Sequence, residues 1–176
     1  TTPPASVTNR IDKFPFAADT NASDVANLSA PMRYQSGQSS ESHGYSSGSL
    51  APWSSTIDKF PFAADTNASS VGNLTNASAP SGGQSSRYYG YSSGGDTAPT
   101  AYLDVIERFP FASDGAAKDV GALSTIRSYT AGQSSRWYGY ATGGTHTPGN
   151  YVDTIDKFPF ASGVTANDIG NLTGTT

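Results

Sequence analysis

The chain of 176 residues contains no cysteine and few charged side chains, which make up 14% of the sequence. Without cysteine, disulfides and thiolate metal sites are excluded. The formal net charge is -4 and no basic patch occurs, so we expect no nucleic-acid partner. No apolar run is long enough for membrane insertion, and no signal peptide begins at Thr1. We therefore expect either a trimmed start or export by another route.

Continuous stripes of Leu and Ala at helical spacing are also absent. The apolar fraction is 35%, and much of it is Ala, Tyr and Phe. The chain has 19 Gly and 11 Pro residues, with Ser and Thr crowded between them. This composition is typical of short strands joined by many turns, so it predicts an all-β fold with a modest core.

What the chain does contain is two recurring signatures. The first is Ile-Asp-Lys-Phe-Pro-Phe-Ala, with Glu-Arg in place of Asp-Lys in one copy; its copies are residues 11–17, 57–63, 106–112 and 155–161. The second is Gly-Gln-Ser-Ser, three variable residues, Gly-Tyr, two small residues and Gly; its copies are residues 37–48, 83–94 and 132–143. Successive first phenylalanines of the Phe-Pro-Phe copies are separated by 46, 49 and 49 residues.

A fixed period of this size is typical of a solenoid, a propeller or an array. We predict one repeat domain, residues 1–176, of about three and a half tandem β-sheet units of roughly 46–49 residues. The units are approximately residues 1–50, 51–95, 96–144 and 145–176, the last one partial. The residues expected to have equivalent structural places are Phe14, Phe16, Phe60, Phe62, Phe109, Phe111, Phe158 and Phe160.

One unit serves to predict the strands. Residues 103–111 alternate apolar and polar side chains, which predicts a strand that is an edge or ends at Pro110. Residues 127–135 and 137–141 read as two further strands. Residues 118–123 fit either a helical turn or a bent strand. The three-residue change in repeat length falls between the Gly-Tyr signature and the next Ile, so this segment is expected to be a surface loop.

The positions of the glycine pairs, aromatic residues and a Leu-Arg segment carry a family resemblance. They are Gly94-Gly95, Gly143-Gly144, Phe60, Phe109, Phe158, Leu74, Leu123 and Arg127. This layout resembles a kelch-type β-propeller blade, with Gly48-Ser49 departing from the glycine pair and the usual Trp missing. The resemblance implies propeller-like, kelch-like blades.

The two signatures together are similar to the arrays in structural proteins of marine tailed phages, particularly those infecting cyanobacteria. This resemblance covers nearly the whole chain and implies a virion component such as a fibre, a tail or a capsid decoration. It implies a location at the virion surface or outside cells, and partners that are other virion proteins or copies of the same chain.

The two signatures do not occur equally often. Four Phe-Pro-Phe halves and three Gly-Gln-Ser-Ser halves leave one half unit unmatched. Three hypotheses account for this: another chain completes a ring, the units remain a short open array, or the sequence is a piece of a longer protein.

Catalysis is not expected. The two histidines, His43 and His146, occupy non-equivalent repeat positions, which does not favour a nucleophile–histidine–carboxylate triad. A pair of carboxylates could act as the catalytic acids of a glycosidase. An acidic residue that recurs in every repeat is more simply explained as a solvent-facing charge or as a hydrogen-bond acceptor in a turn. The acids concerned are Asp12, Asp58, Glu107 and Asp156.

A second acidic set follows the Phe-Pro-Phe copies, and its members are expected to accept backbone hydrogen bonds in a turn: Asp19, Asp65 and Asp114. Clustered Asp and Asn oxygens can bind calcium, but the spacing in this sequence matches no dense ligand loop. We predict no enzyme, no metal and no cofactor.

Aromatic side chains collect at two repeat phases, beside the Gly-Tyr signature and in the variable loop. Exposed aromatics helped by arginine commonly hold sugars, so a host-surface glycan is the candidate ligand. The candidate residues are Trp53, Arg87, Tyr88, Tyr102, Arg136, Trp137 and Tyr151. For these residues we favour a role in packing within or between units over a role in glycan binding. The sequence thus predicts a virion structural protein, with a glycan-binding receptor module as the alternative.

Overall fold

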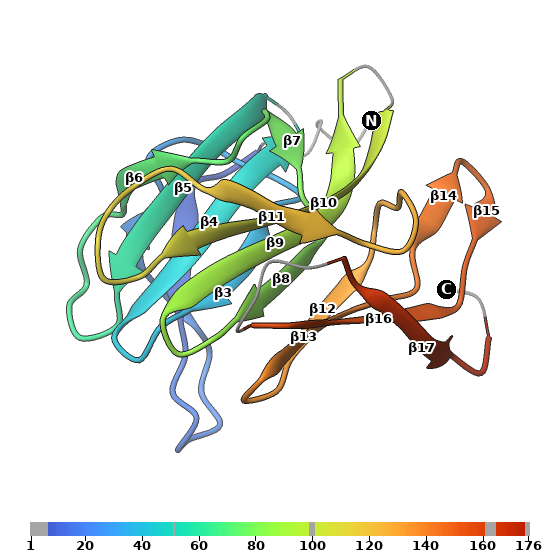
Figure 1. The fold of residues 1–176 in the computed structure, drawn as a ribbon. Coiled ribbons are helices and arrows are strands. Elements are labelled where there is room, and N and C mark those ends of the chain that lie inside the picture. The colour runs from blue at the N-terminus through green and yellow to red at the C-terminus, as the bar shows by residue number, and fades with distance from the viewer. Residues whose placement is uncertain (1–6, 51, 99–100, 161–164, 175–176) are drawn as a thin grey trace, which may run out of the picture.

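In the computed structural model, residues 7–50, 52–98, 101–160 and 165–174 are described, and Ala161 of the last Phe-Pro-Phe-Ala copy lies outside them. The described residues form strands joined by turns and loops, without a helix. The strands make several small antiparallel sheets, and each sheet is open (Figure 1). The prediction of an all-β fold is confirmed.

Four of these sheets follow one another along the chain. The N-terminal sheet contains β1 (Arg10–Lys13) and β2 (Ser23–Asn27). The second sheet has the order β3 (Ser36–Ser39), β4 (His43–Leu50), β5 (Trp53–Pro61) and β6 (Ser69–Asn73).

The third sheet contains β8 (Gly82–Ser85), β9 (Tyr89–Thr97), β10 (Ala101–Pro110) and β11 (Lys118–Ala122), and β7 (Ser78–Ala79) also pairs with β9. The C-terminal sheet has the order β12 (Ala131–Ser134), β13 (Tyr138–Thr142), β16 (Thr154–Pro159) and β17 (Asn167–Asn171). A separate hairpin, β14 (Thr145–Thr147) and β15 (Asn150–Tyr151), lies between its second and third strands in the chain.

The second, third and C-terminal sheets each take four of their strands from the same stretches of sequence. Gly-Gln-Ser-Ser forms the first strand, the Gly-Tyr segment the second and the Phe-Pro-Phe segment the third, and a fourth strand ends just before a leucine. A sheet therefore begins at Gly-Gln-Ser-Ser and crosses a boundary between predicted units. The N-terminal sheet contains only the last two kinds of strand.

The structure decides one open alternative and corrects one predicted strand. Residues 118–123, left open between a helical turn and a strand, form strand β11 up to Ala122. The strand predicted for residues 127–135 is restricted to β12, from Ala131 to Ser134. Tyr129 interrupts it because its backbone has a φ angle of 59°, which is incompatible with an extended chain.

Neighbouring sheets pack face to face, and the core lies between them. Between the second and third sheets the buried cluster is Tyr45, Ile57, Leu74, Phe109 and Ala117. Between the third and C-terminal sheets it is Tyr91, Ile106, Leu123, Ala141, Phe158 and Ala166. In both clusters one sheet supplies Tyr, Ile and Leu, and the following sheet supplies Phe and Ala. We call these surfaces the tyrosine face and the phenylalanine face of a sheet.

The first strands of the sheets approach one another closely at glycine. A Cβ atom on Gly83 would lie 2.2 Å from the carbonyl oxygen of Gly37, and one on Gly132 would lie 2.4 Å from the carbonyl oxygen of Gly83. Real Cβ atoms are not found at such distances, so the close approach of these backbones requires glycine. The repeated Gly-Gln-Ser-Ser strand thus sets the spacing between sheets.

Candidate interaction surfaces

The acids of the Phe-Pro-Phe strands lie in the contacts between sheets. Asp58, Glu107 and Asp156 are 0%, 2% and 0% exposed. Each accepts a hydrogen bond from a backbone N–H of the preceding sheet's trailing loop; the donors are Ser29, Thr75 and Ser124, at 2.8, 2.5 and 2.9 Å. Of the two predicted roles, solvent-facing charge or turn bonding, solvent-facing charge is wrong for all three. Each carboxylate instead accepts a hydrogen bond from an N–H group outside the strand ladders. Asp12, the fourth, is exposed.

Two of these acids have further polar interactions. Asp156 forms a buried ion pair with Arg127, whose Nη2 lies 2.5 Å from the carboxylate, and both side chains are 0% exposed. Burial raises the pKa of Glu107, and hydrogen bonds from Thr75 oppose this shift. The junctions between sheets therefore contain charge that water does not reach.

Lysine and aspartate side chains also join consecutive sheets. The Nζ atom of Lys13 lies 3.0 Å from Asp65, and that of Lys59 lies 3.0 Å from Asp114. The prediction for Asp65 and Asp114 was backbone hydrogen bonding in a turn; their observed partners are instead lysines of the preceding sheet. Asp19, their equivalent in the N-terminal sheet, is exposed.

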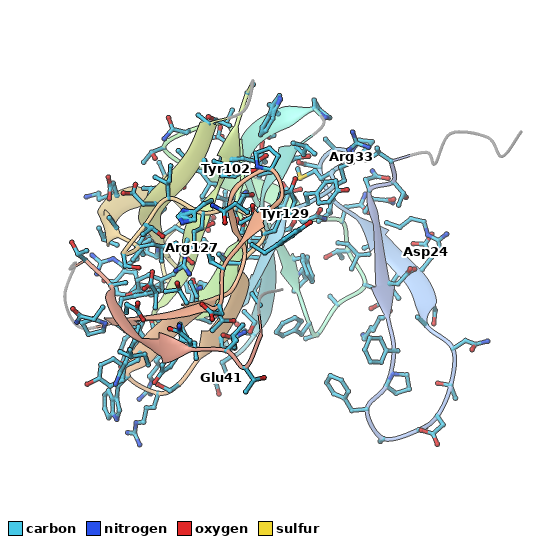
Figure 2. All side chains as sticks on the ribbon, turned by 90° about the vertical axis from the view of Figure 1, so that its right-hand side faces the viewer. Asp24, Arg33, Glu41, Tyr102, Arg127 and Tyr129 are labelled. Atoms are coloured by element: carbon cyan, nitrogen blue, oxygen red, sulfur yellow. The ribbon has the colours of Figure 1, made fainter. Side chains whose placement is uncertain are left out.

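The two end sheets expose residues whose equivalents inside the stack are buried. In the N-terminal sheet Phe14 is 58% and Phe16 is 99% exposed and both line an open cavity shared with the second sheet, whereas Phe109 and Phe158 are 1% and 2% exposed. On the tyrosine face of the C-terminal sheet, Ile169 is 52% exposed. The two end sheets lie apart in both views of the molecule (Figures 1 and 2).

The equivalent phenylalanines accordingly differ in exposure. Those in the third and C-terminal sheets are packed beneath a tyrosine of the preceding sheet: Phe109, Phe111, Phe158 and Phe160. Phe60 is partly buried and Phe62 is 46% exposed. Among the residues that the structure describes, no strand of the N-terminal sheet brings a tyrosine to Phe60 and Phe62.

Four of the predicted glycan-binding residues lie together. Arg87, Tyr88, Arg136 and Trp137 line a cavity of about 900 Å³ beside the β8–β9 and β12–β13 hairpins. Tyr88 is 61% and Trp137 is 64% exposed, so these rings are not core residues. The guanidinium of Arg136 lies 4.7 Å from the Trp137 ring centroid, and that of Arg87 lies 5.4 Å from that of Tyr88. Each ring therefore has an arginine over one face.

The other three candidates lie elsewhere. Tyr102 and Tyr151 line a separate cavity of about 590 Å³, together with Tyr129. Trp53 begins β5 and is partly buried, away from the residues of both cavities. The seven predicted residues therefore occupy three places on the molecule.

Sequence reasoning missed a pair of unusual tyrosines. Tyr34 and Tyr129 have φ angles of 57° and 59°, and each side chain is 57% exposed. Their rings meet edge to face, with centroids 6.5 Å apart, at a cavity of about 260 Å³ that Asp96 also lines. Burial raises the pKa of Asp96, while a hydrogen bond from Ser128 opposes the shift.

A sequence signal for this pair exists. Both tyrosines stand three residues before the glycine of Gly-Gln-Ser-Ser, where the intervening repeat has Pro80. Tyr102 lies near Tyr129 in Figure 2 and lines the neighbouring cavity with it. The positive φ angles mark a strained local backbone, which in other proteins is found at functional sites.

Other kinds of site were considered over the same residues. Within residues 7–50, 52–98, 101–160 and 165–174, no three His, Asp or Glu side chains are grouped so as to hold a metal ion. The described part of the chain has no helix that is long and apolar enough to span a bilayer. Comparison with protein-family models and with curated proteins gives no match for the chain.

Proposed function

We propose that the chain is a non-enzymatic structural protein of a virion, such as a fibre, tail or capsid decoration, that assembles head to tail with other copies. In this proposal its four-stranded sheets are kelch-like, propeller-type blades. The motif resemblance to phage structural proteins supports the virion setting. The observation that carries the assembly is the exposure of complementary halves of one interface at the two ends of the stack.

The proposed contact repeats the aromatic packing found inside the chain. Tyr45 and Tyr91 each pack on two phenylalanines of the next sheet. Tyr140 is their equivalent in the C-terminal sheet and is only partly buried. In the assembly Tyr140 covers Phe14 and Phe16 of the next copy, which removes a large apolar area from water.

The polar contacts have counterparts at the two ends, of which Asp12 also pairs with Arg10 of its own sheet at 3.2 Å. Ala117 and Ala166 donate backbone hydrogen bonds of 2.8 and 2.7 Å to carbonyl oxygens at the end of the preceding sheet. The equivalent pair in the assembly is the N–H group of Ala22 and the carbonyl oxygen of Asn171 of the neighbouring copy. Further equivalent pairs are Lys157 with Asp19, and Thr173 with Asp12. A contact between unlike ends produces a ring if the rotation closes and a filament if it does not.

The test is the molar mass of the purified chain by light scattering after gel filtration, over a range of concentrations. We expect concentration-dependent assemblies for the native chain and monomers for Tyr140→Ala and Phe16→Ala. Trp137→Ala is the matched control, because Trp137 is an exposed aromatic outside both end faces and its loss should leave assembly unchanged. A native chain that stays monomeric at all concentrations contradicts the proposed assembly.

The second candidate function is a glycan-binding receptor module for host attachment. It is favoured by the strained and exposed pair Tyr34 and Tyr129 beside Asp96, since stacking rings with a nearby carboxylate suit a sugar. A glycan array tests it with Tyr129→Ala, Trp53→Ala and Trp137→Ala. Loss of glycan binding with assembly intact supports this function, and failed assembly supports the structural one.

A further inference from the structure

The N-terminal sheet has an unpaired strand edge where the other sheets have a strand. In those sheets a Gly-Tyr strand pairs with the Phe-Pro-Phe strand, as β4 with β5, β9 with β10 and β13 with β16. Among the described residues, β1 pairs with β2 alone. The edge that a Gly-Tyr strand would occupy is therefore open, and such an edge is a template for an added strand.

The register of the internal pairs specifies which residue lies opposite Phe14. Gly44 lies opposite Phe60 and Gly90 opposite Phe109, and Gly139 lies opposite Phe158 in the same way. A Cβ atom at any of the three glycines would lie 2.4 Å from the Cζ atom of the facing ring. The ring thus lies flat on glycine, and a strand added to β1 must present glycine to Phe14.

A tyrosine position is also open beside this edge. The Tyr45 ring stacks on Phe111, with centroids 4.8 Å apart, and the Tyr91 ring stacks on Phe160 at 4.7 Å. Phe62 is the equivalent phenylalanine of the second sheet, and within the described chain no tyrosine covers it. Instead a cavity of about 540 Å³, lined by Phe14, Phe60 and Phe62 among others, lies between the N-terminal and second sheets.

The position beside Gly37 that a Gly-Gln-Ser-Ser strand of the N-terminal sheet would occupy is also open. Gly83 and Gly132 each contact the glycine of the preceding first strand, whereas nothing lies within 4 Å of a Cβ atom placed on Gly37. The hydroxyls of Ser85 and Ser134 accept hydrogen bonds of 2.9 Å from backbone N–H groups of the preceding first strand. Ser39 occupies the equivalent position in the second sheet.

We propose that this edge and cavity are a strand-addition site for a β-hairpin that carries Gly-Gln-Ser-Ser and Gly-Tyr. The hairpin is donated by another polypeptide built from the same repeat. Its glycine lies on Phe14, its tyrosine fills the cavity over Phe62, and its first strand packs on Gly37. Main-chain pairing gives affinity and the two side-chain positions give specificity, as in other cases of β-strand addition. The site lies between the N-terminal and second sheets and does not rest on the proposed head-to-tail function.

The test is binding of a synthetic peptide with the sequence of residues 81–95, which contains one complete hairpin signature. The binding partner is the full chain with Tyr140→Ala, so that head-to-tail assembly does not interfere. Nuclear magnetic resonance titration measures the affinity, and the amides of β1 report the location. We expect saturable binding with protection of the β1 amides from hydrogen exchange.

Peptide and protein variants test the specificity. Replacing the peptide tyrosine equivalent to Tyr91 by Ala should weaken binding at least about tenfold, because the ring loses its cavity. Replacing the peptide glycine equivalent to Gly90 by Val should abolish binding, because its side chain collides with the Phe14 ring. In the protein, Phe62→Ala should weaken binding, whereas Trp137→Ala should not. Equal binding of native and Tyr→Ala peptides overturns the proposal.

An isolated β-hairpin is marginally stable in water, so the free peptide binds weakly if it must first fold. Fusing the hairpin to the chain removes this difficulty. Residues 83–94 are joined ahead of Thr1 of the Tyr140→Ala chain, and the thermal unfolding temperature is compared with that of the same fusion carrying Tyr→Ala in the added segment. We expect the native fusion to unfold several degrees higher. Absence of peptide binding together with equal unfolding temperatures of the two fusions overturns the proposal. Neither measurement depends on head-to-tail assembly. Failure of the strand-addition proposal is therefore distinguishable from failure of the proposed function.

Discussion

The hydroxyl of Tyr91 donates a hydrogen bond of 3.2 Å to the carbonyl oxygen of Phe160, which belongs to the next sheet. Tyr45 and Phe111 have the same relationship at the preceding junction, at 3.5 Å. A tyrosine of one sheet is thus held by both the ring and the backbone of the following one. The stack is stabilised at repeated points, and substitutions at equivalent residues can be compared directly.

Tyr91→Ala should lower the free energy of unfolding by about 3–5 kcal/mol, because it leaves a large cavity between two sheets. Tyr91→Phe keeps the ring and should cost only about 1 kcal/mol for the lost hydrogen bond. Tyr140→Ala is the matched control and should cost less than Tyr91→Ala in the monomer, since no sheet of the same chain covers Tyr140. Urea unfolding measures all three. Equal losses for Tyr91→Ala and Tyr140→Ala contradict the role assigned to the junction.

Arg127→Met should destabilise the chain by about 3–5 kcal/mol, because it leaves the Asp156 carboxylate buried without its cation. Methionine is a reasonable replacement, since Met32 occupies the equivalent repeat position and is buried. Adding Asp156→Asn should recover part of the loss by removing the unpaired charge. Thermal unfolding of the single and double variants checks this, and a double variant less stable than Arg127→Met contradicts it.

Gly83→Ala and Gly37→Ala form a matched pair at equivalent positions. The new methyl group at residue 83 collides with the Gly37 carbonyl, so we expect a loss of about 2–3 kcal/mol, in the range for overpacked sites. At residue 37 the methyl group meets open space, so the loss should be small. Urea unfolding measures the difference. Equal stability of the two variants means that the first strands do not approach as closely as described.

Glu107→Gln should change how stability depends on pH. Burial raises the pKa of Glu107 in the folded chain above its ordinary value of 4.5, so the folded state holds this proton more tightly than the unfolded state. Folding is therefore favoured at low pH, and this contribution is lost as pH rises from about 4.5 through the raised pKa.

The Gln variant has no such proton, so its stability relative to the native chain should increase with pH across this window and then level off. Unfolding midpoints between pH 4 and pH 8 measure the difference between the two chains. A constant difference at every pH contradicts the assigned pKa direction. Asp96, whose pKa burial also raises, is present in both chains and cancels.

The sequence predicted the all-β class because composition and the lack of helical stripes are local properties. The burial of Asp58, Glu107 and Asp156 was not predicted, because their partners lie about thirty residues away in a preceding sheet. A charged residue repeated in each unit has the same local pattern whether it faces water or a neighbouring unit. Only the packing of sheets decides between the two.

The candidate binding residues show the same limit. The exposure of Tyr88 and Trp137 agrees with a surface role, whereas packing was the favoured interpretation from sequence. The sequence position within a repeat did not reveal that Trp53 lies apart from Tyr88 and Trp137. Such a position does not determine on which side of the molecule a loop places its side chains. The strained pair Tyr34 and Tyr129 depends on backbone angles that few residues other than glycine adopt.

The segment between the second and third strands of a sheet is where the repeats differ in length, and in the C-terminal sheet it holds the β14–β15 hairpin. None of its residues belongs to the two buried clusters. Insertions and substitutions in this segment therefore leave the packing between the sheets unaltered. The length and side chains of this segment can thus vary without disturbing the buried core.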